Sequence, residues 1–327
     1  MYRNEPVDVV ISWVDGNDPN HRKKMNPYLR DSFSKWDDIA SPTRYSSVGE
    51  IYFCVASILK FAPFVHKIFV VTDNQNPYLE PFIEQHFQNR STEIVIIDHK
   101  EIFAGYEEIL PVFNSLSLES CLYRIEGLSE NFVYFNDDFF LMRPVEPSDW
   151  FYGGKALAYG MWRNVAFEHL VRKLKPRKHG HLPFGFKDSM LNAVPFSGKH
   201  SWYFCIQHTP FPLKKSVLKA FFDNHPEVLI KNIDHKFRDP EQFNTQALFY
   251  QIGFGEGLCA IAPKGKYLLI KPVGKKVKYI DGKIKYFENH PEILFGCVES
   301  ADKADPEVLR DLFGWLNKLM GTGISIE

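Results

Sequence analysis

The stretch that decides the fold is NFVYFNDDFFL, residues 131–141. It begins with an apolar run of strong β preference, which predicts a buried central strand. This strand ends in Asn136, Asp137 and Asp138. Ligands of open α/β sheets bind at the carboxyl ends of strands, and adjacent carboxylates favour a shared cation. We therefore expect a phosphate site assisted by Mg²⁺ or Mn²⁺, with a plain Asn-Asp turn as the alternative.

The composition is that of a water-soluble globular protein. The chain has 327 residues, of which 45% are hydrophobic and 24% charged, so it can bury a large core. We expect a single catalytic domain over residues 1–327. The net charge of -1 gives no field that would attract nucleic acid, so no nucleic-acid partner is expected.

The cysteines indicate a reducing compartment, and the apolar segments bear on contact with a membrane. The five cysteines are widely spaced and contain no CxxC pair, which favours free thiols over disulfides or a zinc site. No stretch approaches the ~20 apolar residues that span a bilayer. The expected location is cytoplasmic, with any membrane contact peripheral.

Two further strands are predicted to end in polar loops. Residues 7–14 read as a strand that leads to Asp15 and Gly16, where the carboxylate is placed to contact substrate and the glycine lets a ligand approach the backbone. A tight Asp-Gly turn explains the same residues. Residues 66–77 contain a second strand, followed by Asp73.

Between these two strands, residues 20–46 look irregular. A helix is then expected to begin at a capping box formed by Ser47 and Glu50, and to end before Pro63. The strand, helix, strand order predicts a right-handed parallel unit.

LPVFNS, residues 110–115, precedes a predicted helix that runs as far as Ile125. Asn114 lies at its start, where unpaired amides and the helix dipole suit a nucleotide phosphate. Simple capping of the helix is an equally good explanation.

Residues 163–200 are expected to form a basic insertion or flap. Its basic part is RKLKPRKHGH, residues 172–181, and Lys178 within it is a candidate to bind a diphosphate or an anionic acceptor. Contact with acidic lipids is another candidate role. Most such runs are simply solvated surface.

Two catalytic candidates follow later in the chain. His208 stands between an apolar segment and a proline-rich turn, which can orient an imidazole for proton transfer, although a lone histidine is usually structural. Arg238 precedes a helix expected to have Asp239 as its cap and Pro240 at its first position. A surface ion pair is the alternative role for Arg238.

Residues 260–327 are expected to form a hairpin and a docking helix. The hairpin would turn at Asp281-Gly282, between lysines that alternate along KVKYIDGKIKYF. Asp305 would cap a final amphipathic helix that packs on the core.

Six segments in this order resemble the motifs of the Stealth family, the sugar-1-phosphate transferases of bacterial capsule and exopolysaccharide synthesis. They cover most of residues 7–255: SWVDGNDP (12–19), KIFVVTDNQNP (67–77), LPVFNS (110–115), FVYFNDDFFL (132–141), HTPFP (208–212) and the segment that starts at Phe237.

The resemblance implies a GT-A-like α/β fold, a mostly parallel sheet flanked by helices. It also implies transfer of a hexose-1-phosphate, expected to be an N-acetylhexosamine-1-phosphate, from a UDP-sugar to a hydroxyl of a surface polysaccharide, with release of UMP. The partners would be the UDP-sugar, the oligosaccharide or polysaccharide acceptor, and the membrane or the capsule assembly machinery.

By the same resemblance, the residues that match the family's motifs take its roles. Asp15, Asp138, His208 and Arg238 would be catalytic, and Asp137 and Asp138 would hold Mg²⁺ or Mn²⁺. The resemblance and the sequence together make Gly16, Asp73, Asn114, Asn136 and Lys178 candidates for binding the nucleotide or substrate.

One departure concerns the C-terminal part of the site. The family has a cysteine followed closely by Asn-Asp, whereas this chain has Cys297-Val-Glu299-Ser-Ala-Asp302. Glu299 or Asp302 would then replace the family's metal ligands.

The sequence leaves three questions of mechanism open. His208 and Asp15 both remain candidates for the base. A metal-dependent glycosyltransferase would use the same carboxylates but attack the anomeric carbon and release UDP. A binding module without catalysis is the third reading.

Overall fold

The computed structural model describes residues 5–32, 47–88, 90–174, 184–196, 198, 201–263 and 265–324. Its central sheet has the strand order β10-β4-β1-β2-β3. Four of these strands are parallel and β10 is antiparallel to β4. The strands are β1 (Val7–Ser12), β2 (Lys67–Thr72), β3 (Glu93–Asp98), β4 (Asn131–Asn136) and β10 (Phe211–Lys214). The expected mostly parallel α/β sheet is confirmed.

Strand β4 lies inside this sheet, between β1 and β10. Its residues 132–135 are completely buried, as an apolar run with neighbours on both sides requires. The parallel register pairs Ser12 of β1 with Asn136 of β4. Both strands therefore end at the same edge, and this edge receives the polar residues that follow them.

Three smaller sheets surround the central one. Their strand orders are β11-β7-β6, β12-β13-β5 and β8-β9. Their strands are β5 (Phe139–Leu141), β6 (Phe151–Tyr152), β7 (Lys155–Ala158), β8 (Gly160–Asn164), β9 (Trp202–Ile206), β11 (Cys259–Ile261), β12 (Tyr267–Ile270) and β13 (Phe295–Val298).

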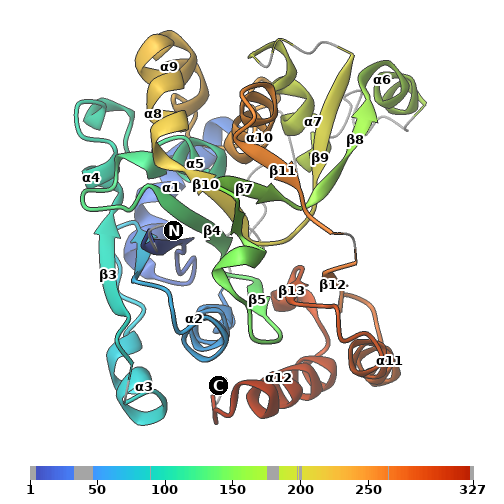
Figure 1. Cartoon of the computed structure of the whole chain (residues 1–327). Coiled ribbons are helices and arrows are strands. Elements are labelled where there is room, and N and C mark those ends of the chain that lie inside the picture. Colours follow the sequence, from blue (N-terminus) through green and yellow to red (C-terminus); the bar gives the residue numbers. More distant parts are fainter. Residues whose placement is uncertain are drawn as a thin grey trace.

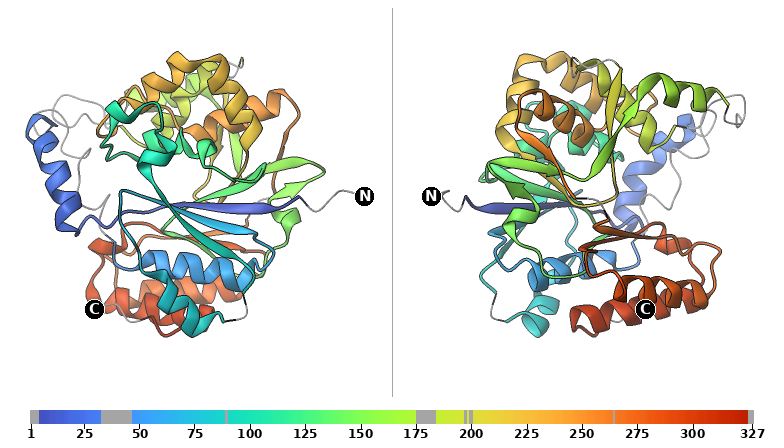
Figure 2. Two further views of the ribbon diagram at one scale, coloured as in Figure 1. Left: turned by 90° about the vertical axis from the view of Figure 1, so that its left-hand side faces the viewer. Right: turned by 45° about the vertical axis from the view of Figure 1, so that its right-hand side comes forward.

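Helices cover both faces of the central sheet (Figures 1 and 2). Helices α2, α11 and α12 lie on one side, and α8, α9 and α10 on the other. The α-helices are α1 (Pro19–Ser32), α2 (Glu50–Phe61), α3 (Leu79–His86), α4 (His99–Ile102), α5 (Ser115–Glu119), α6 (Val165–Lys173), α7 (Phe186–Asn192), α8 (Lys215–Asn224), α9 (Pro226–Ile233), α10 (Thr245–Gly255), α11 (Val277–Glu288) and α12 (Pro306–Met320). Short 3₁₀ helices are η2 (Glu107–Ile109), η3 (Leu122–Arg124), η4 (Pro147–Asp149), η5 (Val194–Phe196) and η6 (Ala301–Lys303).

The C-terminal helix packs on the core as expected. Asp305 caps α12 by accepting a hydrogen bond from the Glu307 amide. The Phe313 ring of α12 stacks on Phe53 of α2, with 5.0 Å between the centroids. One hydrophobic cluster runs from Val7 to Met320, so this helix shares its core with the sheet.

The predicted C-terminal hairpin is wrong, because residues 277–288 form helix α11. Ile280 and Phe287 are its buried side chains, and they are seven residues apart, which is two helical turns. The lysines fall on the remaining faces, so their alternation did not indicate a strand. Gly282 lies within the helix, where a Cβ would meet open space.

Four boundaries also differ from the predicted ones. Residues 20–32, expected to be irregular, belong to α1. The helix after Ser47 begins only at Glu50, with Gly49 as its N-cap residue. The segment after Asn114 forms the short α5 and the 3₁₀ helix η3 in place of one helix. The helix after Arg238 begins at Thr245 and is capped by Asn244, not by Asp239.

Candidate active site

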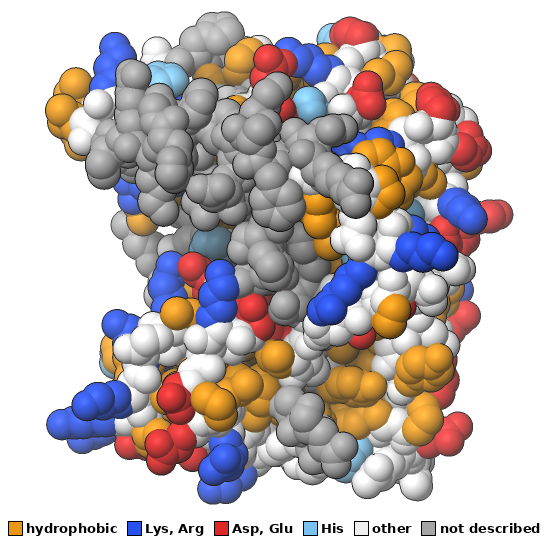
Figure 3. All heavy atoms as spheres, turned by 180° about the vertical axis from the view of Figure 1, so that it is seen from behind, with side chains coloured by type: hydrophobic (Ala, Val, Ile, Leu, Met, Phe, Trp, Pro, Cys, Tyr) orange, Lys and Arg blue, Asp and Glu red, His pale blue; other side chains and the backbone are white. Residues whose placement is uncertain are grey.

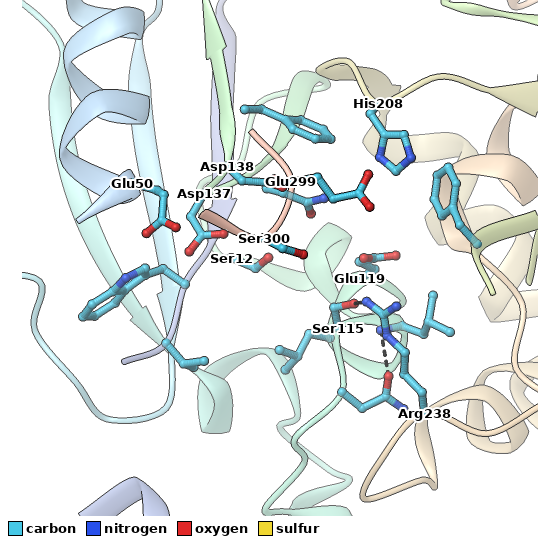
Figure 4. Close-up of a pocket in the computed structure, with 18 of the residues that line it drawn as sticks. Ser12, Glu50, Ser115, Glu119, Asp137, Asp138, His208, Arg238, Glu299 and Ser300 are labelled. Atoms are coloured by element: carbon cyan, nitrogen blue, oxygen red, sulfur yellow. Dashed lines mark hydrogen bonds between the residues drawn. The ribbon is translucent and has the colours of Figure 1, made fainter. Parts of the chain in front are cut away.

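A cavity of about 560 Å³ lies at the carboxyl ends of β1 and β4. Its lining comes from the ends of both strands, the start of α2, helix α5, and the loops around Phe186, His208, Arg238 and Glu299. Figure 4 shows part of this lining. Eight of the candidate residues named from the sequence lie here: Asn114, Asn136, Asp137, Asp138, His208, Arg238, Glu299 and Asp302.

The Asp pair after β4 shares one end of the cavity with Glu50, the first residue of α2 (Figure 4). Burial, and then the charges of Glu50 and Asp138, raise the pKa of Asp137 well above its usual value. Burial and the charge of Glu50 raise the pKa of Asp138 to about 7. Burial also raises the pKa of Glu50. Three carboxyls thus face one another where water is scarce, and each makes ionisation of the others harder.

The Asp138 side chain has one oxygen that suits a cation. Its Oδ2 accepts a hydrogen bond from the Cys297 thiol at 3.6 Å. Its Oδ1 is buried and has no hydrogen-bond partner among the described residues. Carboxylate oxygens are the ligands that Mg²⁺ and Mn²⁺ prefer. The residues present therefore fit a divalent cation, although no group of three or more possible ligands is arranged as a finished metal site within the described part of the chain.

The second end of the cavity carries a buried carboxyl and a guanidinium. Glu119 of α5 is 6% exposed, and burial raises its pKa to about 7 even though the charge of Arg238 acts to lower it. Arg238 donates a hydrogen bond from Nη2 to Ser115 Oγ at 2.8 Å. This end therefore offers one fixed positive charge and one carboxyl that titrates near neutral pH.

Asn114 holds Arg238 in place by fastening α5 to the 237–242 loop. Its side chain caps α5 by accepting a hydrogen bond from the Leu116 amide. Its Nδ2 donates to the Phe237 carbonyl at 3.0 Å and to Gln242 Oε1 at 2.6 Å. Asn114 is 4% exposed, so the geometry shows a structural role and leaves its contact with a phosphate as a prediction.

His208 lies between two phenylalanine rings. Its imidazole stacks on Phe186 with 4.7 Å between centroids, and meets the edge of Phe139 at 6.5 Å. Burial lowers the pKa of His208 below its usual value. The ring is therefore neutral at pH 7, which is the state a proton acceptor requires.

The C-terminal segment in which this chain differs from the family's motif does reach the cavity. Glu299, Ser300 and Asp302 all line it. Ser300 has a φ of +59°, a left-handed conformation that turns the chain sharply after β13. The Glu299 carboxylate forms an ion pair with Lys271 Nζ at 2.7 Å, so a metal would have to compete with this lysine.

Three candidates lie outside the cavity lining. Asp15 Oδ1 accepts a hydrogen bond from the Asn17 amide, and the Gly16 carbonyl accepts one from Arg22 Nε. Asp73 binds His21 at 3.1 Å and Lys24 at 2.9 Å. Burial raises the pKa of Asp73, but these bonds outweigh that effect and lower it. The same bonds fasten α1 to the end of β2. Lys178 lies outside the described residues.

Glu50 and Glu119 also line the cavity, although their sequence context did not mark them as site residues. Glu50 was predicted to pair with Ser47 in a capping box. This role at the start of a helix gave no indication that its carboxylate lies close to the Asp pair. In the structure, its carboxylate accepts a hydrogen bond from the Val48 amide. The signal for Glu119 is that it is the single charged residue in SLSLESCL, residues 115–122, where a buried charge needs a reason.

Comparisons with known proteins identify the family. Residues 44–158 match "Stealth protein CR2, conserved region 2", and residues 5–32 match "Stealth protein CR1, conserved region 1". The receptor polysaccharide phosphotransferase WefC of Streptococcus gordonii is 32% identical over 77% of this chain and 79% of its own length. The chain belongs to the Stealth family. It is therefore a transferase, and the resemblance noted in its motifs is confirmed.

Two further similarities were found. The capsular polysaccharide phosphotransferase WcwK of Streptococcus pneumoniae is 29% identical to this Stealth protein over 76% of the chain and 79% of its own length. The solved galactosyltransferase LgtC matches with a TM-score of 0.46 and 11% identity over 97% of each chain. No helix in the described part of the chain is long and apolar enough to cross a bilayer.

Proposed function

We propose that this Stealth protein transfers a hexose-1-phosphate, such as an N-acetylhexosamine-1-phosphate, from a UDP-sugar to a hydroxyl of a surface polysaccharide. The products are a phosphodiester and UMP. The observation that carries this proposal is the shared cavity, which brings His208, Arg238 and the Asp137–Asp138 pair together from segments far apart in the chain. The names of the relatives, which are polysaccharide phosphotransferases, support the same reaction class.

In the proposed reaction, the acceptor oxygen attacks the β-phosphorus in line with the bond that joins it to the α-phosphate. The new oxygen–phosphorus bond forms as that bond breaks, and the α-phosphate leaves as part of UMP. His208 takes the proton of the acceptor hydroxyl, because it is neutral and faces the cavity. The enzyme contributes mainly by positioning and by neutralising charge.

Arg238 would neutralise the negative charge of the transferred phosphoryl group. It carries a permanent charge, and the hydrogen bond to Ser115 fixes its orientation. At the other end of the cavity, Asp137, Asp138 and Glu50 would hold Mg²⁺ or Mn²⁺, with Asp302 nearby. The bound cation would neutralise the charge of the diphosphate.

Phosphorus NMR of the products tests the proposal directly. The purified protein is incubated with Mg²⁺, a panel of UDP-sugars and acceptor oligosaccharides. We expect UMP to accumulate and a phosphodiester signal to appear in the saccharide fraction. An Asp137→Asn variant should give neither product.

The same experiment separates the rival functions. A glycosyltransferase would release UDP and leave no phosphorus in the saccharide. A binding module would bind the UDP-sugar without turnover, and Asp137→Asn would then have no product to abolish. Either result would overturn the proposed phosphotransfer.

A further inference from the structure

Helix α6 is amphipathic, and its polar face is turned toward the protein. Glu168 of this helix is only 7% exposed and forms ion pairs with Arg163 at 3.0 Å and Lys187 at 3.7 Å. Arg172 binds Asp188 at 3.3 Å. Lys187 and Asp188 belong to α7, so these ion pairs fix α6 on the fold through its charged side.

The apolar face of α6 points outward instead. Phe167 is 60% exposed, Leu170 56% and Leu174, which caps the helix, 78%. The spacing i, i+3, i+7 places these three side chains on one face. An amphipathic helix in a globular protein usually buries such a stripe, so its exposure calls for a partner.

Another large apolar side chain lies near the beginning of α6. Trp202, the first residue of β9, is 50% exposed. The Val165 amide at the start of α6 donates a hydrogen bond to the carbonyl of Ser201, next to this tryptophan. Tryptophan is enriched where proteins meet the interface of a bilayer, because the ring combines an apolar body with a polar N–H group.

The sequence around α6 is rich in basic residues. Residues 163–200 contain eight Lys and Arg but only two acids, Glu168 and Asp188, and both acids are the buried members of ion pairs. His169 and Lys173 are exposed on the helix itself. In Figure 3, apolar and basic side chains lie side by side at the upper left edge, where α6 lies in this view. An apolar stripe with a basic surround complements an anionic lipid surface.

The position of α6 relates this surface to the cavity. Phe186, the first residue of α7, lines the cavity and stacks on His208. The next two residues of α7 bind α6 through the ion pairs described above. A surface that holds α6 would therefore lie close to the cavity wall that carries the candidate base.

We propose that the Phe167, Leu170 and Leu174 face of α6 docks the protein on an anionic membrane surface. The apolar side chains enter the boundary between headgroups and acyl chains, and Lys173 binds the lipid charges. The protein then works on acceptors presented at that surface. This inference does not rest on the proposed reaction, because its readout is vesicle binding.

The test is co-sedimentation of the full chain with vesicles of phosphatidylcholine, alone or with phosphatidylglycerol. We expect binding only when the anionic lipid is present, and weaker binding at high salt. Replacing Phe167, Leu170 and Leu174 by serine should lower the partition coefficient at least about tenfold, since each side chain contributes buried apolar area. Lys173→Gln should lower it about fivefold.

A matched variant controls for the loss of apolar surface in general. Tyr152, Ile230 and Ile261 are 70%, 44% and 51% exposed and lie on other elements, so their replacement by serine should leave vesicle binding unchanged. Turnover of a water-soluble donor and acceptor should be the same in both triple variants, which also shows that they fold.

Three outcomes would overturn the inference. The unmodified chain could fail to bind anionic vesicles, or the α6 variant could bind as well as the matched variant. Alternatively, analytical ultracentrifugation could show an unmodified dimer that the α6 variant converts to a monomer, with no vesicle binding by either. The face would then belong to a contact between two copies.

Discussion

The position of His208 makes it the preferred one of the two proposed bases. Phe186 and Phe139 fix its ring at the cavity, and burial keeps it neutral at pH 7. The Asp15 carboxylate instead accepts a hydrogen bond from the Asn17 amide in a turn outside the cavity lining. The structure therefore favours His208 as the proton acceptor.

Replacing each candidate tests this assignment. His208→Ala should lower kcat by about 10²- to 10⁴-fold, the usual effect of removing a general base. Asp15→Asn should lower it less than about tenfold, because an amide oxygen can still accept the turn hydrogen bond. In the unmodified enzyme at saturating Mg²⁺, kcat/KM should fall on the acid side only below the ordinary histidine pKa of about 6.5. Near-normal turnover by His208→Ala, together with loss in Asp15→Asn, would move the role to Asp15.

The local sequence predicted only part of the candidate site. Asp137 and Asp138 follow an apolar run that is typical of a buried strand. Their position at the edge of the sheet could therefore be predicted. Glu50 and Glu119 lie in helical segments whose apolar neighbours dominate the pattern. Their closeness to Asp138 and Arg238 depends on how α2 and α5 pack on the sheet, and periodicity does not contain that information.

At the scale of elements, the loop that carries Arg238 is held by one buried glutamine. Gln242 Nε2 donates to the Asn232 carbonyl at 2.7 Å and to Ser117 Oγ at 3.1 Å. Its Oε1 accepts from the Asp239 amide at 2.9 Å and from Asn114 Nδ2 at 2.6 Å. This side chain therefore joins α5, the end of α9 and the loop.

Gln242→Leu should loosen this junction. It leaves several buried polar groups without partners, so we expect a loss of about 2–4 kcal/mol in the free energy of unfolding. Displacement of Arg238 should lower kcat/KM as well. Gln251→Leu is the control, since Gln251 is 1% exposed and its Nε2 makes only a long bond of 3.4 Å to Met190 O. Equal losses of stability in both variants would show that Gln242 has no special role.

Elements were predicted best where burial alone sets the pattern. Strands β1, β2 and β4 and helix α12 have apolar runs or stripes that match their structure. Helix α11 was misread because Asp281-Gly282 is a strong turn signal and its lysines alternate. The buried pair Ile280 and Phe287 decided the outcome, and their burial against the C-terminal sheet and α12 is a tertiary effect that a local pattern does not show.

At the scale of the whole molecule, buried carboxyls with raised pKa values make stability depend on pH. Glu119 and Asp138 both have pKa values of about 7 in the native state, raised above their ordinary values by burial. Between about pH 4 and pH 7, the native state keeps protons that the unfolded chain has lost. Stability should therefore fall as pH rises through this range. Asp73 acts in the opposite direction, since its lowered pKa stabilises the fold above pH 4 and is lost in stronger acid.

Denaturant unfolding of the unmodified chain in EDTA should accordingly show a stability maximum near pH 4, about 1–3 kcal/mol above the value at pH 8. Mg²⁺ should recover much of this loss at pH 8, because it binds the ionised carboxylates of the native state, and it should have little effect at pH 5, where protons compete. Asp138→Asn removes one buried charge, so this variant should be more stable than the unmodified chain at pH 8 in EDTA while responding less to Mg²⁺. If Mg²⁺ does not change the free energy of unfolding of the unmodified chain at pH 8, the cavity is not a cation site. The phosphate charge would then have to be neutralised by Arg238 and neighbouring bases alone.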